Sequence, residues 1–103
     1  MKVVITPTAQ RQIDSQISFG IERFGRRVAE LTFGRISRFF ATTLADYPKS
    51  GRSLATQNLH ETLIPRTPFV VIYRIEAEAD IVRVLGFFHY AQDRTNFEAD
   101  DES

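Results

Sequence analysis

Residues 59–89 read LHETLIPRTPFVVIYRIEAEADIVRVLGFFH, and this stretch decides the fold. Two runs rich in β-branched and aromatic residues, Phe69–Ile75 and Ile81–Phe88, are joined by the short polar segment Glu76–Asp80. Such a density of Val, Ile, Phe and Tyr fits a pleated sheet better than a helix. The connection is too short for a parallel crossover, so the two runs should pair antiparallel. With Leu63–Ile64 just upstream, the stretch predicts three consecutive strands in a meander.

Both long strands are expected to be apolar on their two faces. Strict alternation puts Phe69, Val71, Tyr73 and Ile75 on one face of the first strand and Val70, Ile72 and Arg74 on the other. It likewise puts Ile81, Arg83, Leu85 and Phe87 opposite Val82, Val84, Gly86 and Phe88. A strand that is apolar on both sides has to be covered on both sides. Helices of the same chain can cover one face, which leaves the other for a partner or for the chain's own loops and tail.

Length and composition describe one ordinary domain. The chain has 103 residues, of which 43% are hydrophobic and 25% charged, and we expect a single domain over residues 1–103. The absence of cysteine excludes disulfides and thiolate metal sites, which suits a cytoplasmic protein. The first ten residues are too polar for a signal peptide, and no apolar run approaches the roughly 18 residues of a membrane helix. No metal or cofactor motif is present, so we expect neither.

Charge is unevenly distributed along the chain. The formal net charge is zero, but the last six residues hold four acids and no base, so the rest of the chain carries a net charge of +4. We expect residues 95–103 to form a flexible acidic tail on a mildly basic body. A mild positive charge permits nucleic-acid contact but argues against a dedicated phosphate binder.

The first part of the chain predicts a strand followed by a helical hairpin. Lys2–Ile5 is a short β-branched run, and Thr6-Pro7 is a common helix start. One helix face then carries Ala9, Ile13, Ile17, Ile21 and Phe24. Gly25 is a suitable stop, and a second helix should run from about Arg26 to Leu44.

The second helix should bury an apolar stripe against the sheet. The stripe consists of Ala29, Phe33, Ile36, Phe40 and Leu44, with Phe33 and Phe40 as its aromatic core. Phe19 and Phe39 lie off the stripes and are candidates for an exposed patch.

A turn follows the second helix and leads into the meander. Pro48 and Gly51 should turn the chain, and we expect a positive φ at Gly51. Ser53–Asn58 is a polar loop or a weak edge strand. The element order is therefore β-α-α-β-β-β, an α+β fold in which a helical hairpin packs on a small antiparallel sheet.

Four segments in this order resemble the RelE/ParE superfamily of bacterial toxins, which belong to type II toxin–antitoxin modules. They are Thr6-Pro7-Thr8-Ala9, Leu44-x-x-x-Pro48-x-x-Gly51-Arg52, Ile64-Pro65-Arg66-Thr67-Pro68-Phe69-Val70-Val71-Ile72-Tyr73-Arg74 and His89-Tyr90-Ala91-Gln92-Asp93-Arg94. The resemblance spans about residues 2 to 94, and it is stronger to the ParE branch than to the RelE branch.

The resemblance implies a cytoplasmic toxin that a cognate antitoxin binds and silences, in a possible toxin–antitoxin hetero-oligomer. ParE-branch members poison DNA gyrase and have no known catalytic centre. RelE-branch members are endoribonucleases that cleave messenger RNA on the ribosome. We expect the first activity and keep the second as the alternative.

The alternative makes specific demands on the residues. RNA cleavage through the 2′-hydroxyl needs an acid–base pair and cations that stabilise the phosphorane. The RelE-like reading would draw these from His89, Tyr90, Arg52 and His60, although His60 stands where the family usually has an Arg before Glu-Leu. His89 can equally be a strand-end residue bonded to backbone. On the ParE-like reading no residue is catalytic, and the expected partner-binding residues are Arg66, Arg74, Arg83, Arg94 and Phe97.

Overall fold

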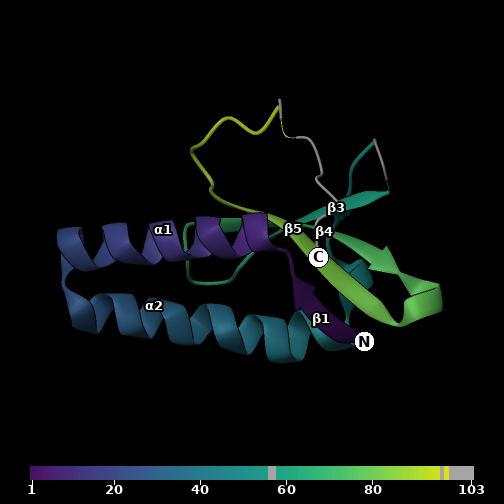
Figure 1. Ribbon diagram of the computed structural model, residues 1–103, viewed down its shortest axis with the longest axis horizontal. Helices are drawn as coiled ribbons and strands as arrows, with labels where there is room; N and C mark the ends of the chain where they lie inside the picture. The colour runs from purple at the N-terminus through teal and green to yellow at the C-terminus, as the bar shows by residue number, and fades with distance from the viewer. Residues whose placement is uncertain (56–57, 96, 98–103) are drawn as a thin grey trace.

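Two helices pack on one face of a five-stranded sheet (Figure 1). The computed structural model describes residues 1–55, 58–95 and 97. The strands are β1 (Lys2–Ile5), β2 (Arg52–Ser53), β3 (Leu59–Leu63), β4 (Phe69–Glu76) and β5 (Ile81–His89), in the spatial order β1-β5-β4-β3-β2. The helices are α1 (Pro7–Phe24) and α2 (Arg26–Phe39), followed by the short helical turns η1 (Phe40–Leu44), η2 (Pro48–Ser50) and η3 (Ala77–Ala79).

The predicted α+β fold is confirmed, but the sheet is mixed rather than wholly antiparallel. Strands β2 to β5 pair antiparallel, whereas β1 pairs parallel with β5, from Lys2 opposite Ile81 to Ile5 opposite Val84. The contacts of Thr6, the N-cap residue of α1, account for the parallel pairing of β1. Thr6 is fully buried; its hydroxyl donates to the Val84 carbonyl at 3.0 Å and accepts from the Ala9 N–H at 3.2 Å. Parallel pairing therefore brings the helix N-cap directly onto the sheet.

The helical hairpin breaks at Gly25 as predicted, but α2 ends at Phe39, and the chain continues to Leu44 as the π-helical turn η1. Gly25, with a φ of 91°, ends α1 and precedes α2, and its N–H donates to the Ile21 carbonyl. The loop end of the hairpin projects beyond the sheet (Figure 1). Among the described residues, no helix is long and apolar enough to cross a membrane.

The main core lies between the hairpin and the sheet. It contains Ala9, Ile13, Ile36, Phe39, Phe40, Leu44, Ile64, Phe69, Val71, Tyr73, Val82, Val84 and Phe87. The prediction for Phe40 is confirmed, but those for Phe33 and Phe39 are wrong: Phe33 is 47% exposed and Phe39 is buried. Ala29, at the N-terminal end of the same stripe, is buried, so Phe33 is the one stripe residue that stays exposed, while Phe39 takes a place in the core.

Strict alternation along β5 fails at a β-bulge. Ile72 lies opposite Gly86 and Tyr73 lies opposite Val84, so Leu85 is an extra residue between them. A bulge reverses the side on which the following residues point. Phe87 therefore joins Val84 in the core beneath the helices, whereas Leu85 lies on the opposite face.

Gly51 corrects another expectation, since its φ is −77° and not positive. A Cβ at this position would collide with the Tyr73 hydroxyl and would lie 3.0 Å from the Glu61 carbonyl oxygen. That hydroxyl donates a 2.6 Å hydrogen bond to the Pro48 carbonyl. Glycine is thus required by the close approach of Tyr73 to the turn, not by backbone conformation.

The first prediction concerns the main core. Phe40 is 8% exposed, so Phe40→Ala should lower the free energy of unfolding by roughly 3–5 kcal/mol. Phe33→Ala is the matched control and should cost no more than about 1 kcal/mol, because Phe33 is already half exposed. Urea denaturation followed by circular dichroism measures both. Equal losses for the two variants would contradict the packing of α2.

Candidate functional site

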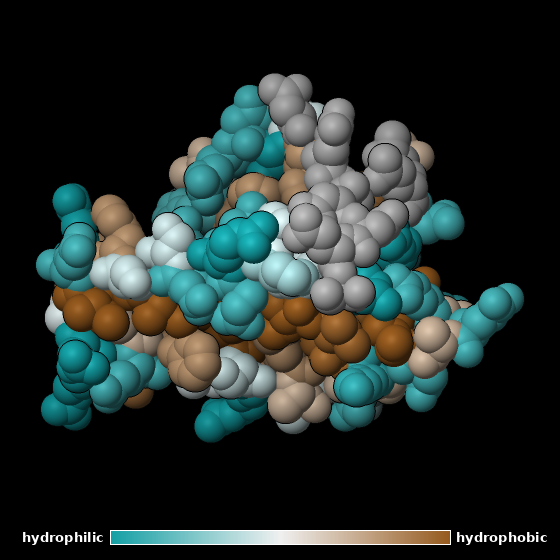
Figure 2. All heavy atoms as spheres, in the orientation of Figure 1, coloured by the Kyte–Doolittle hydropathy of each residue, from teal (hydrophilic) through white to brown (hydrophobic). Residues whose placement is uncertain are grey.

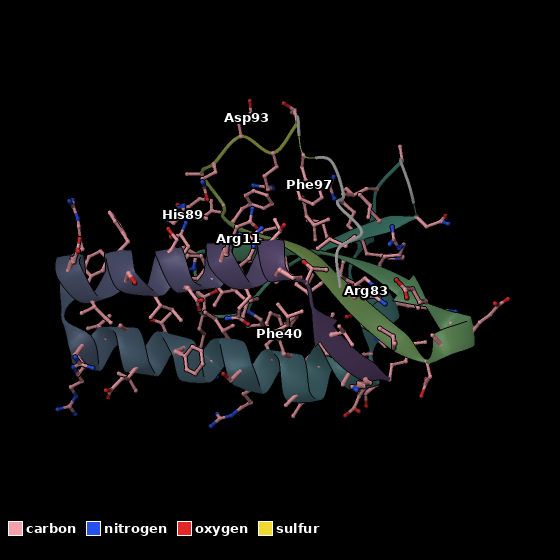
Figure 3. All side chains as sticks on the ribbon, in the orientation of Figure 1. Arg11, Phe40, Arg83, His89, Asp93 and Phe97 are labelled. Carbon is pink, nitrogen blue, oxygen red and sulfur yellow. The ribbon has the colours of Figure 1, made fainter. Side chains whose placement is uncertain are left out.

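The sheet face that the helices leave uncovered carries a second, smaller core. Leu59, Ile72 and Leu85 are buried there, and Leu54, Phe88 and Phe97 pack against them. Both faces of the sheet are thus apolar, as predicted. We call this side the open face. Part of it is covered by the chain's own C-terminal segment, meaning residues 90–95 and 97, which loops over the sheet on the side away from α2 (Figure 3).

The C-terminal segment is held by backbone bonds and by one aromatic ring. The Tyr90 N–H donates to the Pro68 carbonyl at 2.7 Å as the chain leaves β5. Phe97 packs edge-on against Phe88, with ring centroids 5.5 Å apart. A Cβ on Gly86 would lie 2.8 Å from the Phe97 ring. Gly86 therefore leaves the space on the sheet that the Phe97 ring occupies.

Glu61 ties the C-terminal segment to the sheet electrostatically. Its carboxylate accepts from Arg52 Nη2 at 3.0 Å and from Arg94 Nε at 3.2 Å, and its side chain is 14% exposed. Burial acts to raise the pKa of Glu61, but hydrogen bonds and charges from Arg94 and Arg52 outweigh it and the pKa is lowered. Arg94 also donates to the carbonyls of Tyr90 and Gln92. One guanidinium thus shapes the segment and anchors it.

A second carboxylate pairs with arginines at the other end of the open face. Glu76 accepts two hydrogen bonds from Arg83, at 2.7 and 3.1 Å, and lies 3.6 Å from Arg74 Nε. Hydrogen bonding from Arg83 is the main reason that the pKa of Glu76 is lowered. Arg74 and Arg83, two of the four predicted partner-binding arginines, are therefore half-buried and shared with one acid; Figure 3 shows Arg83 beside the hairpin of β4 and β5.

A hollow of about 510 Å³ lies between the C-terminal segment and the sheet. Its charged lining residues are Arg52, Glu61, Asp93 and Arg94, two cations and two carboxylates. Hydrogen bonds from Thr95 lower the pKa of Asp93, so this acid too is ionised near neutral pH. The formal charge of the lining is zero, which suits a mixed polar and apolar protein contact better than a phosphorane.

Of the four residues considered for catalysis, Arg52 and Tyr90 line this hollow and His89 stacks on Tyr90, whereas His60 lies apart from them. His60 stacks on Tyr73 on the helix side of the sheet, with centroids 5.4 Å apart, and its buried Nδ1 has no hydrogen-bond partner among the described residues. Arg52 lies on the open face with Glu61. His89 and Tyr90 do stack on each other at 4.9 Å, and His89 Nδ1 accepts from the Ala91 N–H. His89 is thus bonded to backbone, as its structural interpretation expected.

A groove on the hairpin side is lined almost wholly by apolar surface. It encloses about 350 Å³ between the two helices and the end of the sheet. Its lining includes Ile17, Phe19, Phe24, Val28, Phe69 and His89. Figure 2 shows the hydrophobic band between the helices continuing to the loop end of the hairpin. Phe24 is 62% exposed, because the hairpin extends beyond the sheet that would bury it.

Arg66 stands apart from the other predicted partner-binding residues. It occupies the turn between β3 and β4, with a φ of 62°, and its carbonyl accepts a 3.3 Å hydrogen bond from Arg35. Of the predicted tail, Thr95 and Phe97 are described, and residues 96 and 98–103 lie outside the described residues.

The two carboxylates that organise the open face, Glu61 and Glu76, were not among the predicted site residues. Glu61 pairs with Ile72 across the ladder, and Glu76 ends β4. Alternation along the strands places each acid on the same sheet face as an arginine of a neighbouring strand. This pattern in the sequence could have indicated the pairing.

Comparisons with known proteins agree with this architecture. Residues 3–94 match the family described as "ParE toxin of type II toxin-antitoxin system, parDE". A solved structure, "Chromosomal ParDE TA system from P. aeruginosa", is similar with a TM-score of 0.72 and 15% identity, over 86% of this chain and 95% of that one. At that identity the likeness shows the fold. A search of curated proteins finds no match.

The second prediction concerns Glu61. Because the fold lowers its pKa, its stabilising contribution is complete above the unfolded pKa, about 4.3, and disappears as the pH falls through the lower folded value. Glu61→Gln should therefore cost about 1–2 kcal/mol at pH 7, and the difference from wild type should shrink as the pH falls below the unfolded pKa. Thermal unfolding between pH 3 and 7 measures it.

The matched control is Glu78→Gln, since Glu78 is exposed on η3. This variant should stay within about 0.5 kcal/mol of wild type at neutral pH. A Glu61→Gln difference that persists unchanged to pH 3 would show that packing, not charge, accounts for it.

Proposed function

Because this chain belongs to the ParE toxin family of type II toxin–antitoxin systems, we propose that it inhibits DNA gyrase and that a cognate antitoxin neutralises it. The observation that supports a binding mechanism most directly is the pairing of the open-face arginines. Arg52 and Arg94 pair with Glu61, and Arg74 and Arg83 pair with Glu76.

This pairing is poorly suited to RNA cleavage. A phosphorane is stabilised by cations whose charge is directed at it, and a nearby carboxylate opposes that charge. Each arginine pair here shares an ionised acid with a lowered pKa. Such a surface is better suited to recognition of a protein, where arginines and aromatic groups often contribute most of the binding energy.

The gyrase contact is proposed for the open face and the C-terminal segment. Arg94 and Phe97 hold the segment against the sheet, and the exposed side chains of Leu63 and Tyr90 add apolar surface. Arg74 and Arg83 lie at the far end of the same face, where acidic groups of a partner can compete with Glu76.

The antitoxin contact is proposed for the groove on the hairpin. Exposed Phe24 and Val28 offer sites for the apolar residues of an amphipathic segment. Exposed Arg23, Arg26 and Arg27 surround the loop end of the hairpin. An antitoxin segment with apolar anchors and acidic flanks would complement both features.

The third prediction tests the gyrase contact. The double variant Arg94→Gln/Phe97→Ala should lose inhibition of gyrase supercoiling by at least about tenfold, since it removes both anchors of the C-terminal segment. It should still bind the antitoxin with unchanged affinity, which isothermal titration calorimetry can verify. His89→Ala is the matched control and should inhibit gyrase nearly as well as wild type. A double variant that inhibits fully would locate the gyrase contact elsewhere.

The stacked pair of His89 and Tyr90 is the observation that favours the alternative, ribosome-dependent cleavage of messenger RNA. A general acid or base contributes about two to four powers of ten in rate. If the chain is an endoribonuclease, His89→Ala should lose cleavage by that factor while remaining folded. Parallel assays of wild type on gyrase supercoiling and on ribosome-bound messenger RNA decide between the two functions.

The fourth prediction tests the antitoxin contact. Phe24→Ala/Val28→Ala should weaken antitoxin binding by roughly 10–100-fold, because it removes two apolar anchors. Its melting temperature should change little, since both side chains are exposed. Tyr47→Ala, at a side chain that is 68% exposed and does not line the groove, is the control. Equal affinity for all three proteins would exclude the groove.

A further inference from the structure

Three arginines meet at the C-terminal half of α2, away from the two surfaces already described. Arg35 and Arg38 come from α2, and Arg66 comes from the turn between β3 and β4. They line a hollow of about 120 Å³ together with Phe39, Thr42, Thr43 and Pro65. The described residues that line it include no carboxylate. This is the opposite of the open face, where every arginine pair shares an acid.

The charge of α2 extends the cluster along the helix. Glu30 is the sole acid in the sequence of α2, against Arg26, Arg27, Arg35 and Arg38. Arg27 and Arg38 are eleven residues apart, which brings them to nearly the same side of the helix about 16 Å from each other. Positive charge therefore continues beyond the hollow, as contact with an extended polyanion would require.

Arg66 has a backbone conformation that an arginine rarely adopts. Its φ of 62° is in the left-handed region, where glycine is favoured and side chains are strained. The turn is held by Thr67, whose N–H and hydroxyl both donate to the Ile64 carbonyl, at 3.2 and 2.9 Å. The Arg66 carbonyl in turn accepts from Arg35 Nη1 at 3.3 Å. Arg66 is thus held in a strained backbone conformation, and its carbonyl is hydrogen-bonded to the guanidinium of Arg35.

We propose that this cluster binds the phosphate backbone of a nucleic acid. Guanidinium groups match phosphate oxygens in a bidentate geometry, and Thr43 is a further polar residue at the same hollow, whereas the Thr42 hydroxyl donates to the Arg38 carbonyl. An acidic protein segment fits less well, because Phe39 is buried and the hollow offers little aromatic surface as an anchor. Phosphate binding by this cluster does not depend on gyrase inhibition. A toxin that acts on a gyrase–DNA complex would nevertheless gain affinity from such binding.

The experiment measures binding of the purified full chain to fluorescent 20-base-pair DNA and RNA duplexes by anisotropy, across a range of salt concentrations. Three phosphate contacts predict a slope of log K against log salt of about −3 for DNA. Binding should not depend on base sequence, because phosphate contacts carry no sequence information. Arg35→Gln/Arg38→Gln should reduce the magnitude of the slope by about 2 and the affinity at 0.1 M salt by about a hundredfold.

Two single variants separate the site from general charge and from stability. Arg66→Gly removes the cation and relieves the strained φ, so it should weaken binding about tenfold at 0.1 M salt while the melting temperature stays equal or rises. Arg11→Gln removes the same charge from α1, where Arg11 lines a hollow with Phe88 and Gln92, and should leave the slope nearly unchanged.

Three outcomes would overturn the proposal. The first is no binding to either duplex at 50 mM salt. The second is an equal loss for Arg11→Gln and Arg66→Gly, which would mean diffuse attraction without a site. The third is arginine variants that keep duplex binding but lose antitoxin binding, which would assign the cluster to an acidic protein partner.

Discussion

Burial of strand β4 on both of its faces is the constraint on which the rest of the structure depends. Every residue from Phe69 to Tyr73 is buried. Each such side chain contributes about 1.5–3 kcal/mol when it is removed from water, so neither face can be left open at small cost. The helical hairpin covers one face and the C-terminal segment covers part of the other. A segment that looks like a polar extension is therefore part of the fold.

The bulge in β5 lets one strand serve both cores. The bulge at Leu85 and Gly86 reverses the side on which the following side chains of β5 point. Phe87 therefore packs beneath the helices, while Phe88 packs against the ring of Phe97. Bulges re-aim side chains and are frequent next to functional sites. Here the bulge lies under the C-terminal segment, so the shape of the proposed gyrase surface depends on it.

Burial also determines which charged side chains need a partner of opposite charge. On the open face Glu61 and Glu76 are half-buried, and a half-buried carboxylate is favourable only with partners, which the arginines supply. On the outer side of α2 the arginines are exposed to water and need no acid beside them. The molecule thus has a charge-balanced face, an apolar groove and a basic cluster, which are suited to three different kinds of contact.

Local patterns in the sequence determined the strands, the Thr6-Pro7 helix start and the break at Gly25, because propensity, capping and turn chemistry act between near neighbours. They also predicted a sheet apolar on both faces. Packing between distant segments decided the rest. The bulge at Leu85 depends on the register with Ile72, and the need for glycine at position 51 depends on a tyrosine 22 residues away. The exposure of Phe33, the parallel pairing of β1 and the pairing of Arg94 with Glu61 likewise depend on where the hairpin, the sheet and the C-terminal segment meet. No local pattern carries that information, since it arises only when the chain closes on itself.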